Sequence, residues 1–383
     1  MLNRLNSPLI STLIVGIIIS LFIFGRLYRS GFDFSSFVVA GDTFCDPALV
    51  PQNLIVLRNS VGYDGQFYYR LSLNPFTSQV REFGITIDSP PIRHQRILYP
   101  LLTWTLSLGN PSLVPVIMVL INFISLCVMG WLGGAYAQTL KEHALWGIFL
   151  PLYPGFLFTL ARDLVEILEI TLLLGSLFLI RRSKPVAATL LLALAVLTKE
   201  TALLVAIAAL IVYVFEWWKG KEVKSLRWYY FTLPMAIFFL WQAALFYNWG
   251  RFPIHASGSS NLALPFVAPA GFLLDMSALQ TNFQRHNFIE LIFLAGFSFA
   301  VFYHLRWSAA TRLEIVSCLL YAALAVSLGR AVWIEDWAFF RAASQFCALG
   351  TIIIIASKGK IKAFVFGCSC LFWLYLSSRL ILD

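Results

Sequence analysis

An acidic residue set among glycine and aromatic residues is the feature of this sequence that best fits catalysis. Asp64 lies in residues 62–71, between Tyr63 and Gly65, and helical spacing continues from it to Leu73. We therefore expect Asp64 in the first helical turn, where the helix dipole and free amide groups favour the ionised carboxylate. An ionised carboxylate can take a proton from a hydroxyl group, so Asp64 is our candidate catalytic base. The structural alternative for the same residue is an N-terminal helix cap.

Three basic side chains follow in the same polar segment. Arg93, His94 and Arg96 directly precede the apolar run that begins at Ile97, so they are expected at the membrane surface. Arginine suits phosphate because its planar fork donates two hydrogen bonds at once, and an anionic lipid headgroup fits this position. Interfacial snorkelling is the alternative for each arginine.

Two predicted turns carry charged residues close to lipid depth. Asp163 and Glu166 are three residues apart and share a helix face, which Glu169 continues, and Lys199 and Glu200 form the second turn. Such residues are costly within a membrane unless they are paired or functional. The sequence leaves open whether they form a structural ion network or part of a site.

Arg341 closes a stretch, residues 330–341, that mixes charges with aromatic rings. Tryptophan belts at a membrane interface explain the rings. Arg341 itself opens the next apolar run, where it can reach a lipid phosphate or snorkel to the interface.

The composition excludes a soluble globule. Of 383 residues, 59% are hydrophobic, 16% are aromatic and only 12% are charged. That is too little charge to cover the surface of a soluble protein of this size. We therefore predict one polytopic, all-α transmembrane domain over residues 1–383. The net charge of +9 lies in short clusters between apolar runs, which does not favour nucleic acid as a partner.

The apolar runs predict about eleven transmembrane helices. The expected spans are residues 8–26, 112–136, 144–161, 164–180, 186–198, 201–215, 228–247, 287–304, 313–328, 342–356 and 363–381. Residues 27–96 form the first loop, in which we expect interfacial helices. Residues 97–108 are expected as a helix that lies at or dips into the outer surface.

Basic residues in the short loops set the predicted orientation. Four clusters fall on one face under this span list, and we expect that face to be cytoplasmic, together with the N-terminus. The clusters contain Arg181, Arg182 and Lys184; Lys219, Lys221, Lys224 and Arg227; Arg306 and Arg312; and Lys358, Lys360 and Lys362. The first loop and both charged turns then face the extracytoplasmic side of a plasma (inner) membrane.

The motif search is negative for several common chemistries. The sequence contains no Walker-type phosphate loop, no dinucleotide glycine fingerprint, no HExxH and no nucleophile elbow. Its six cysteines show no zinc-type spacing. We therefore expect no metal ligands, and nothing supports a divalent cofactor.

At this point the sequence resembles the GT-C superfamily of integral membrane glycosyltransferases, which includes the mannosyltransferases of glycolipid anchors and proteins and the bacterial aminoarabinose transferases. The resemblance covers most of the chain in layout. It rests on a first span, then a long loop with the residues Tyr63, Asp64, Gly65, Gln66, Phe67 and Tyr68, and then the run from Arg96 to Leu102. The turns at Asp163 and Lys199 are further, weaker points of similarity. The chain lacks the large C-terminal domain and the paired loop aspartates of well-known members.

The resemblance implies transfer of a sugar from a polyprenyl-phosphate carrier to an acceptor hydroxyl on the extracytoplasmic face, with inversion. The implied partners are the lipid-linked sugar and membrane lipids. Asp64 would be the base, and Tyr63, Gln66 and Tyr68 would line the substrate site. The cation beside the lipid phosphate would come from Arg93, His94, Arg96, Lys199 or Arg341, with Asp163, Glu166 and Glu200 close by. The product would be a surface glycan, glycolipid or glycoprotein.

Two other functions remain alternatives at this point. A flippase for a lipid-linked saccharide would use Asp163, Glu166, Lys199 and Glu200 to line a translocation path, with Asp64 as a helix cap. A surface-polysaccharide polymerase or ligase would need catalytic basic residues in a later outer loop, for which the sequence offers Arg251, His255, Arg285 and His286.

Overall fold

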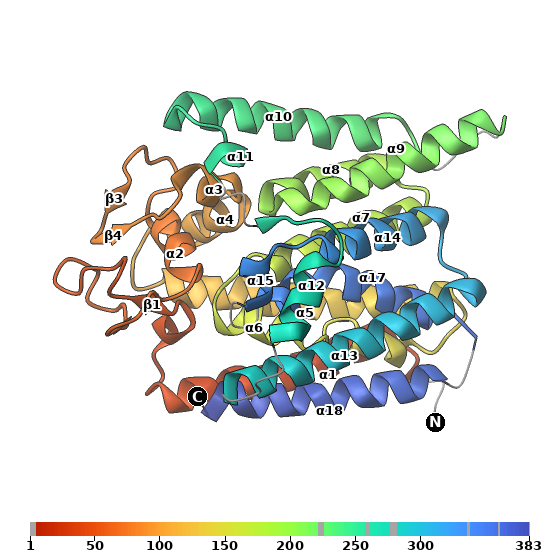
Figure 1. Ribbon diagram of the computed structural model, residues 1–383, viewed down its shortest axis with the longest axis horizontal. Coiled ribbons are helices and arrows are strands. Elements are labelled where there is room, and N and C mark those ends of the chain that lie inside the picture. Colours follow the sequence, from red (N-terminus) through yellow and green to blue (C-terminus); the bar gives the residue numbers. More distant parts are fainter. Residues whose placement is uncertain are drawn as a thin grey trace.

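The structure, a computed structural model, describes residues 5–220, 226–256, 261–275, 282–334, 338–358 and 361–382. Lys221, Lys224, Glu335, Asp336 and Lys360, which the sequence analysis used or spanned, lie outside the described residues. Long helices run side by side, and a cap of short elements covers one end of them (Figure 1). We call this end, which carries residues 30–113, the loop end, and the other the opposite end.

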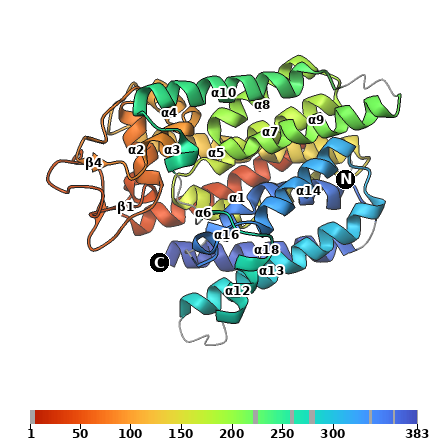
Figure 2. The same ribbon diagram turned by 45° about the horizontal axis from the view of Figure 1, so that its top comes forward.

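The long helices run along the bundle in alternating directions (Figure 1). Two groups of helices lie at its edges in both views: α8 to α10 on one side and α13 with α18 on the other (Figure 2). Their bounds are α1 (Pro8–Arg29), α5 (Val114–Thr139), α7 (Glu166–Arg181), α8 (Pro185–Thr198), α9 (Leu203–Trp218), α10 (Tyr229–Trp249), α13 (Asn282–His304), α14 (Arg312–Val326), α17 (Ser344–Ile355) and α18 (Ile361–Leu382).

Six helices of the described chain are long and apolar enough to cross a membrane. They begin at Pro8, Val114, Glu200, Tyr229, Arg285 and Lys362. The expected number of about eleven spans is not confirmed, because α7, α8, α14 and α17 are 16, 14, 15 and 12 residues long. A helix of that length falls short of the roughly 30 Å hydrocarbon core.

The expected span at residues 144–161 is not one helix. It consists of the 3₁₀ segment η3 (Ala144–Phe149) and the short helix α6 (Gly155–Ala161). The interruption contains Pro151 and Pro154, which cannot continue a helix. Backbone packing against α5 accompanies it, because a Cβ atom on Gly147 would lie 2.0 Å from the carbonyl carbon of Gly133. Such an approach requires glycine on both sides and is incompatible with a regular, side-chain-separated helix pair.

The cap at the loop end contains short helices and two minimal sheets. The helices are η2 (Phe34–Phe37), α2 (Gly65–Leu73), α3 (Pro90–Gln95) and α4 (Leu98–Ser107). The strands β1 (Ala40–Gly41) and β2 (Val56–Leu57) pair in parallel, and β3 (Arg81–Glu82) and β4 (Ile85–Thr86) pair antiparallel. Helices inside the first loop were expected, and α4 is the expected helix at residues 97–108.

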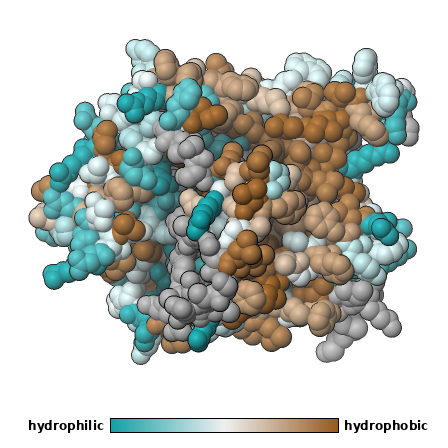
Figure 3. Space-filling view, viewed as in Figure 1, coloured by the Kyte–Doolittle hydropathy of each residue, from teal (hydrophilic) through white to brown (hydrophobic). Residues whose placement is uncertain are grey.

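The centre of the bundle is formed by α6, α7 and α17. Every residue of α6 and α17 is buried. Hydrophobic side chains cover much of the visible surface of the helices, whereas hydrophilic ones gather over the cap (Figure 3). An apolar belt with a polar end fits a multi-pass membrane protein. The loop-end termini of the buried helices therefore meet the polar cap.

Ion pairs join the helices at the opposite end. Arg181 at the end of α7 pairs with Glu314 on α14 at 2.8 Å, and Lys362 on α18 pairs with Glu142 at 2.8 Å. Arg312 pairs with Glu216. The described members of the four basic clusters lie at this end, away from the first loop (Figure 1).

The remaining short helices are α11 (Pro253–Ala256), α12 (Val267–Asp275), α15 (Arg330–Ile334) and α16 (Ala338–Ala342). Of these, α16 leads directly into the buried helix α17. It thereby carries Arg341 to the loop end of the bundle.

Candidate functional site

Two glycines place Asp64 at the start of α2. Gly62 has φ +66°, a conformation that other residues rarely adopt, and it turns the chain toward the bundle. A Cβ atom on Gly65 would lie 2.2 Å from the carbonyl oxygen of Arg162, so α2 begins in direct contact with the turn after α6. The backbone N–H of Tyr63 donates to the carbonyl of Val39 at 2.8 Å. The glycines around Asp64 therefore serve close packing between the loop and the bundle.

Gln66 forms hydrogen bonds within the first loop. Its Oε1 accepts the backbone N–H of Gly41 at 3.0 Å and the Cys45 thiol at 3.3 Å, and its Nε2 donates to the carbonyl of Val61 at 2.9 Å. The side chain is 1% exposed. Gln66 was expected to bind substrate, and the structure instead gives it a full set of partners within the first loop.

The carboxylate of Asp64 faces two arginines from distant segments. Oδ1 lies 2.9 Å from Arg93 of α3, and Oδ2 lies 3.2 Å from Arg341 of α16. Asp64 makes no side-chain capping hydrogen bond, although it holds the N-cap position of α2. The helix-cap alternative for Asp64 is therefore wrong in this structure.

Arg93 is shared between two carboxylates. Its Nε and Nη2 donate to both oxygens of Asp88 at 2.9 and 2.7 Å, while its Nη1 faces Asp64. The guanidinium also lies 4.6 Å from the ring centre of Phe67, within cation–π range. A planar fork that is stacked and bonded on three sides has a fixed orientation.

Arg341 is shared in the same way. Besides Asp64, its Nε lies 3.5 Å from Glu166 at the start of α7. Tyr63 presents its ring to this guanidinium at 5.3 Å and to that of Arg162 at 5.0 Å. Tyr63 therefore packs its ring face against these two guanidinium groups.

The second charged turn completes the cluster. Lys199 Nζ donates to Glu166 at 3.0 Å, and both side chains are almost fully buried. Arg96 donates to both oxygens of Glu200 at 3.1 and 2.7 Å and to the Tyr68 hydroxyl at 3.0 Å. We define the charged centre by these pairs: Asp64, Asp88, Glu166, Glu200, Arg93, Arg96, Lys199 and Arg341. Its four acidic and four basic side chains come from five separate segments of the chain.

A polar extension runs from the charged centre into the bundle. Gln345 on α17 donates to Glu169 at 2.9 Å and to Thr201 at 3.2 Å, and Glu169 is 0% exposed. Asp163 is also 0% exposed and lies in the turn between α6 and α7, beside Asn122, with φ +49°. A positive φ at a buried aspartate is uncommon and costs stability, so this turn is held by its surroundings.

His94 makes a different set of contacts. Its Nε2 bonds the carbonyl of Pro75 at 2.7 Å, and its Nδ1 accepts the indole N–H of Trp249 at 3.1 Å. Burial lowers the pKa of His94, which agrees with a neutral ring that accepts at one nitrogen. Of the five cations considered for a phosphate, His94 is the one that ties the loop to α10 instead.

The electrostatics of Asp64 follow from its neighbours. Burial raises the pKa of Asp64, but the charges of Arg93, Arg341 and Arg96 outweigh burial and hold it well below the usual range. The Asp64 charge likewise keeps the pKa of Arg93 above its usual range despite burial. Asp64 and Arg93 are therefore both ionised at neutral pH.

Sequence reasoning missed several residues of this region: Asp88, Gln345 and Asn122. The position of Asp88 could have indicated contact with Arg93, because Asp88 stands just before the helix that holds Arg93. The others are ordinary residues of apolar segments, and only packing shows where they lie. Arg251 and His255 lie near α11 and α3, whereas Arg285 and His286 belong to α13, so these four do not form one cluster.

Within the described residues, no group of three or more His, Cys, Asp or Glu is arranged to hold a metal ion. Comparison with protein-family models found no match, and comparison with curated proteins found no significant relative.

Proposed function

We propose that this protein is a membrane glycosyltransferase of the GT-C type, which moves a sugar from a polyprenyl-phosphate carrier to an acceptor hydroxyl at the loop end of the bundle. The observation that carries the proposal is the position of Asp64. A carboxylate that is 20% exposed meets two arginines, 13% and 15% exposed, where the central helices of a membrane bundle end. Lipid-borne phosphate and a soluble hydroxyl can both reach such a place.

The reaction needs a base and a cation, and the charged centre holds both. The acceptor oxygen attacks the anomeric carbon of the sugar while the bond from that carbon to the phosphate oxygen breaks. The acceptor proton passes to Asp64, and the departing polyprenyl phosphate takes up negative charge. Arg93 and Arg341 stabilise that charge in a site largely shielded from water. Attack opposite the leaving phosphate inverts the anomeric configuration.

In this structure Asp64 is a weak base because two arginines hold it ionised. A donor phosphate placed between the same arginines competes with Asp64 for their hydrogen bonds. Once Arg93 and Arg341 turn toward phosphate, the Asp64 carboxylate loses its counter-charges and its proton affinity rises. Binding of the donor therefore prepares the base, and Asp88 and Glu166 keep the two arginines oriented during the exchange.

Aromatic rings supply the remaining features of a sugar site. Tyr63 and Phe67 present faces next to the two arginines, and the Tyr68 hydroxyl lies against Arg96. Ring faces and hydroxyl groups are typical surroundings for a sugar and for the first isoprene units of its carrier. Under this proposal the loop end faces away from the cytoplasm, so the acceptor is a glycan, glycolipid or glycoprotein outside the inner membrane.

A flippase for a lipid-linked saccharide is the second candidate, and one observation favours it. The polar extension through Glu169, Thr201 and Gln345 leads from the charged centre toward the middle of the bundle. A transferase does not need polar residues at that depth, whereas a translocation path does.

The test uses purified protein in proteoliposomes with a panel of radiolabelled polyprenyl-phosphate sugars. A transferase gives labelled acceptor with at least one donor, and the Asp64→Asn variant gives none. Labelled lipid that crosses the bilayer without any labelled acceptor would instead establish the flippase.

A further inference from the structure

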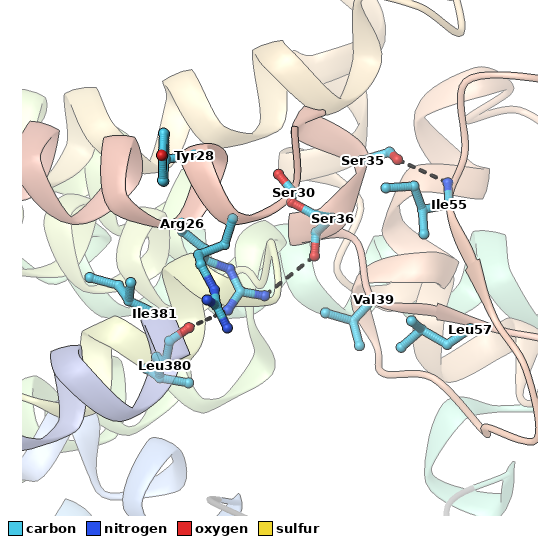
Figure 4. A pocket seen from close by; sticks show the side chains of 11 residues that line it. Arg26, Tyr28, Ser30, Ser35, Ser36, Val39, Ile55, Leu57, Leu380 and Ile381 are labelled. Carbon is cyan, nitrogen blue, oxygen red and sulfur yellow. Dashed lines mark hydrogen bonds between the residues drawn. The ribbon is translucent and has the colours of Figure 1, made fainter. Parts of the chain in front are cut away.

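A second feature of the loop end is a hollow of about 640 Å³, separate from the charged centre. It lies between the C-terminal ends of α1 and α18 and the first loop (Figure 4). Its lining combines two arginines with apolar side chains and the serines of the turn after α1. The lining residues used below are Arg26, Arg29, Val39, Ile55, Leu57 and Leu380.

Carbonyl oxygens hold both arginines at the rim of this hollow, and the charge of Arg26 also acts on the buried carboxyl group of Asp163. Arg26 donates to the carbonyl oxygens of Leu380 at 2.8 Å and of Ser36 at 3.4 Å. Arg29 is exposed, donates to the carbonyl of Leu382 at 3.1 Å, and forms no ion pair with another described residue. A guanidinium has five N–H donors, so Arg29, with one bond to a carbonyl and an exposed side chain, is able to bind a phosphate as well.

The apolar part of the lining is partly exposed. Ile55 and Leu57 are 38% and 44% exposed although they stand beside each other around strand β2. Arginines that only complement the helix dipole of α1 or snorkel to the interface would need no apolar wall on the facing loop. An amphiphile with a charged head and hydrocarbon below it accounts for both parts.

The position of the hollow determines which amphiphile can reach it. Both α1 and α18 are long and apolar enough to span a membrane, and the hollow opens where both helices end. A lipid of the surrounding bilayer therefore presents its headgroup at this level without leaving the membrane. Arg26 and Arg29 lie at the loop end, whereas lysine and arginine residues are expected to concentrate at the opposite end.

We infer that this hollow binds the phosphate headgroup of an anionic membrane phospholipid, with Arg29 on the phosphate, the charge of Arg26 beside it, and the first acyl carbons against Ile55 and Leu57. The site is distinct from the charged centre, and it does not depend on the proposed transferase activity. It is close enough to matter for that centre, because the carbonyl of Val39, a lining residue, accepts the backbone N–H of Tyr63 at 2.8 Å. A bound lipid braces the segment that precedes Asp64.

The test measures lipid retention by native mass spectrometry of the whole protein released from nanodiscs that contain phosphatidylglycerol and phosphatidylcholine in equal amounts. We expect wild type to retain phosphatidylglycerol preferentially. Arg26→Gln and Arg29→Gln should each reduce that preference about fivefold, since each basic residue contributes about that factor at a lipid surface. Arg58→Gln is the matched control, because Arg58 is an exposed arginine of the same loop outside the hollow.

A second variant keeps the arginines and removes the space. Leu57→Trp fills the hollow with a larger ring at a half-exposed position and should also lower retention of phosphatidylglycerol. Unchanged retention in this variant and in Arg29→Gln would overturn the inference. Thermal stabilisation of detergent-solubilised wild type by millimolar inorganic phosphate equal to that by phosphatidylglycerol would assign the site to a soluble anion and would equally contradict a lipid site.

Discussion

Ion pairs occur at both ends of the bundle, but they are built differently. At the opposite end, Arg181 and Glu314 are mutual partners, and Glu314 also closes a capping box with Thr311 at the start of α14. At the loop end, Arg93 and Arg341 each divide their hydrogen bonds or ion pairs between two carboxylates, and Asp64 and Glu166 each face two cations. One end holds pairs, and the other holds a network.

The difference matters because the two arrangements respond differently to an incoming anion. A cation with a single well-packed partner gives up its whole stabilisation when that partner is displaced. A cation with two partners can turn toward a phosphate and keep one of them. The opposite end is therefore suited to hold helices together, and the charged centre is suited to bind and release an anionic substrate.

The largest expected effect on stability is at the opposite end. Arg181→Gln leaves Glu314, which is 1% exposed, as a buried charge without its partner and should lower the free energy of unfolding by about 3 kcal/mol. The double variant Arg181→Gln, Glu314→Gln should recover most of that loss, because it removes the charge. Chemical unfolding in detergent micelles measures the stability of both variants. Equal stability of the single and double variants would contradict a stabilising pair between Arg181 and Glu314.

The same substitution at the loop end should affect turnover more than stability. Arg341→Gln leaves Asp64 with Arg93 and Glu166 with Lys199, so the loss of stability should be smaller than the about 3 kcal/mol expected for Arg181→Gln. Turnover should fall about 100-fold, since a cation beside the leaving phosphate is lost. A loss of stability like that of Arg181→Gln, with normal turnover per folded molecule, would erase the distinction between the two ends.

Close packing of α2 gives a third test. Gly65→Ala places a Cβ atom 2.2 Å from the carbonyl oxygen of Arg162, so α2 must shift, at about 1–3 kcal/mol. Because Asp64 moves with α2, turnover should fall as well. Gly31→Ala is a control in the same loop, where a new Cβ atom meets nothing within 4 Å, although its φ of +67° carries a small strain of its own. Similar turnover in the two variants would show that the position of α2 does not matter.

The smallest expected effect is a shift in pH dependence. The pKa of Asp64 is lowered in the folded protein, so its stabilising contribution is present above the unfolded pKa and is lost as the pH falls through the folded pKa. Arg93→Gln removes one of the cations that lower the pKa, and the acid midpoint for unfolding should move upward by up to about one pH unit. An unchanged midpoint would mean that Arg93 does not control the charge of Asp64.

Part of this site could be predicted, because alternating spans fix which loops share an end. Counting spans placed residues 27–96, the turns at Asp163 and Lys199, and Arg341 on one face. The number of spans and the loop layout are not confirmed, but ion pairs join Asp64, Glu166, Lys199 and Arg341. The broken segment at residues 144–161 did not change that alternation, since η3 and α6 together still lead from one end to the other. Its irregular shape was predictable in part from Pro151 and Pro154, which interrupt the run, whereas the contact between Gly133 and Gly147 is only seen in the folded protein.

The partners within the site were not predictable. Hydropathy does not distinguish Arg93 and Arg341, which face Asp64, from His94, which faces Trp249 and Pro75. Which of these side chains faces Asp64 depends on the direction of each short helix in the cap. The hydrogen bonds of Gln66 were not predictable for the same reason, since they depend on the fold of residues 41–61 around it.

The central claim is that Asp64 is the base of a transfer reaction, and one comparison tests it most directly. Sugar transfer from the donor panel is measured in proteoliposomes for wild type, Asp64→Asn and Asp46→Asn, the last being a control at an exposed aspartate that pairs with Arg81 in the same loop. We predict that Asp64→Asn lowers turnover at least about 100-fold at equal expression, while Asp46→Asn stays near wild type. Near-normal transfer by Asp64→Asn would contradict the account.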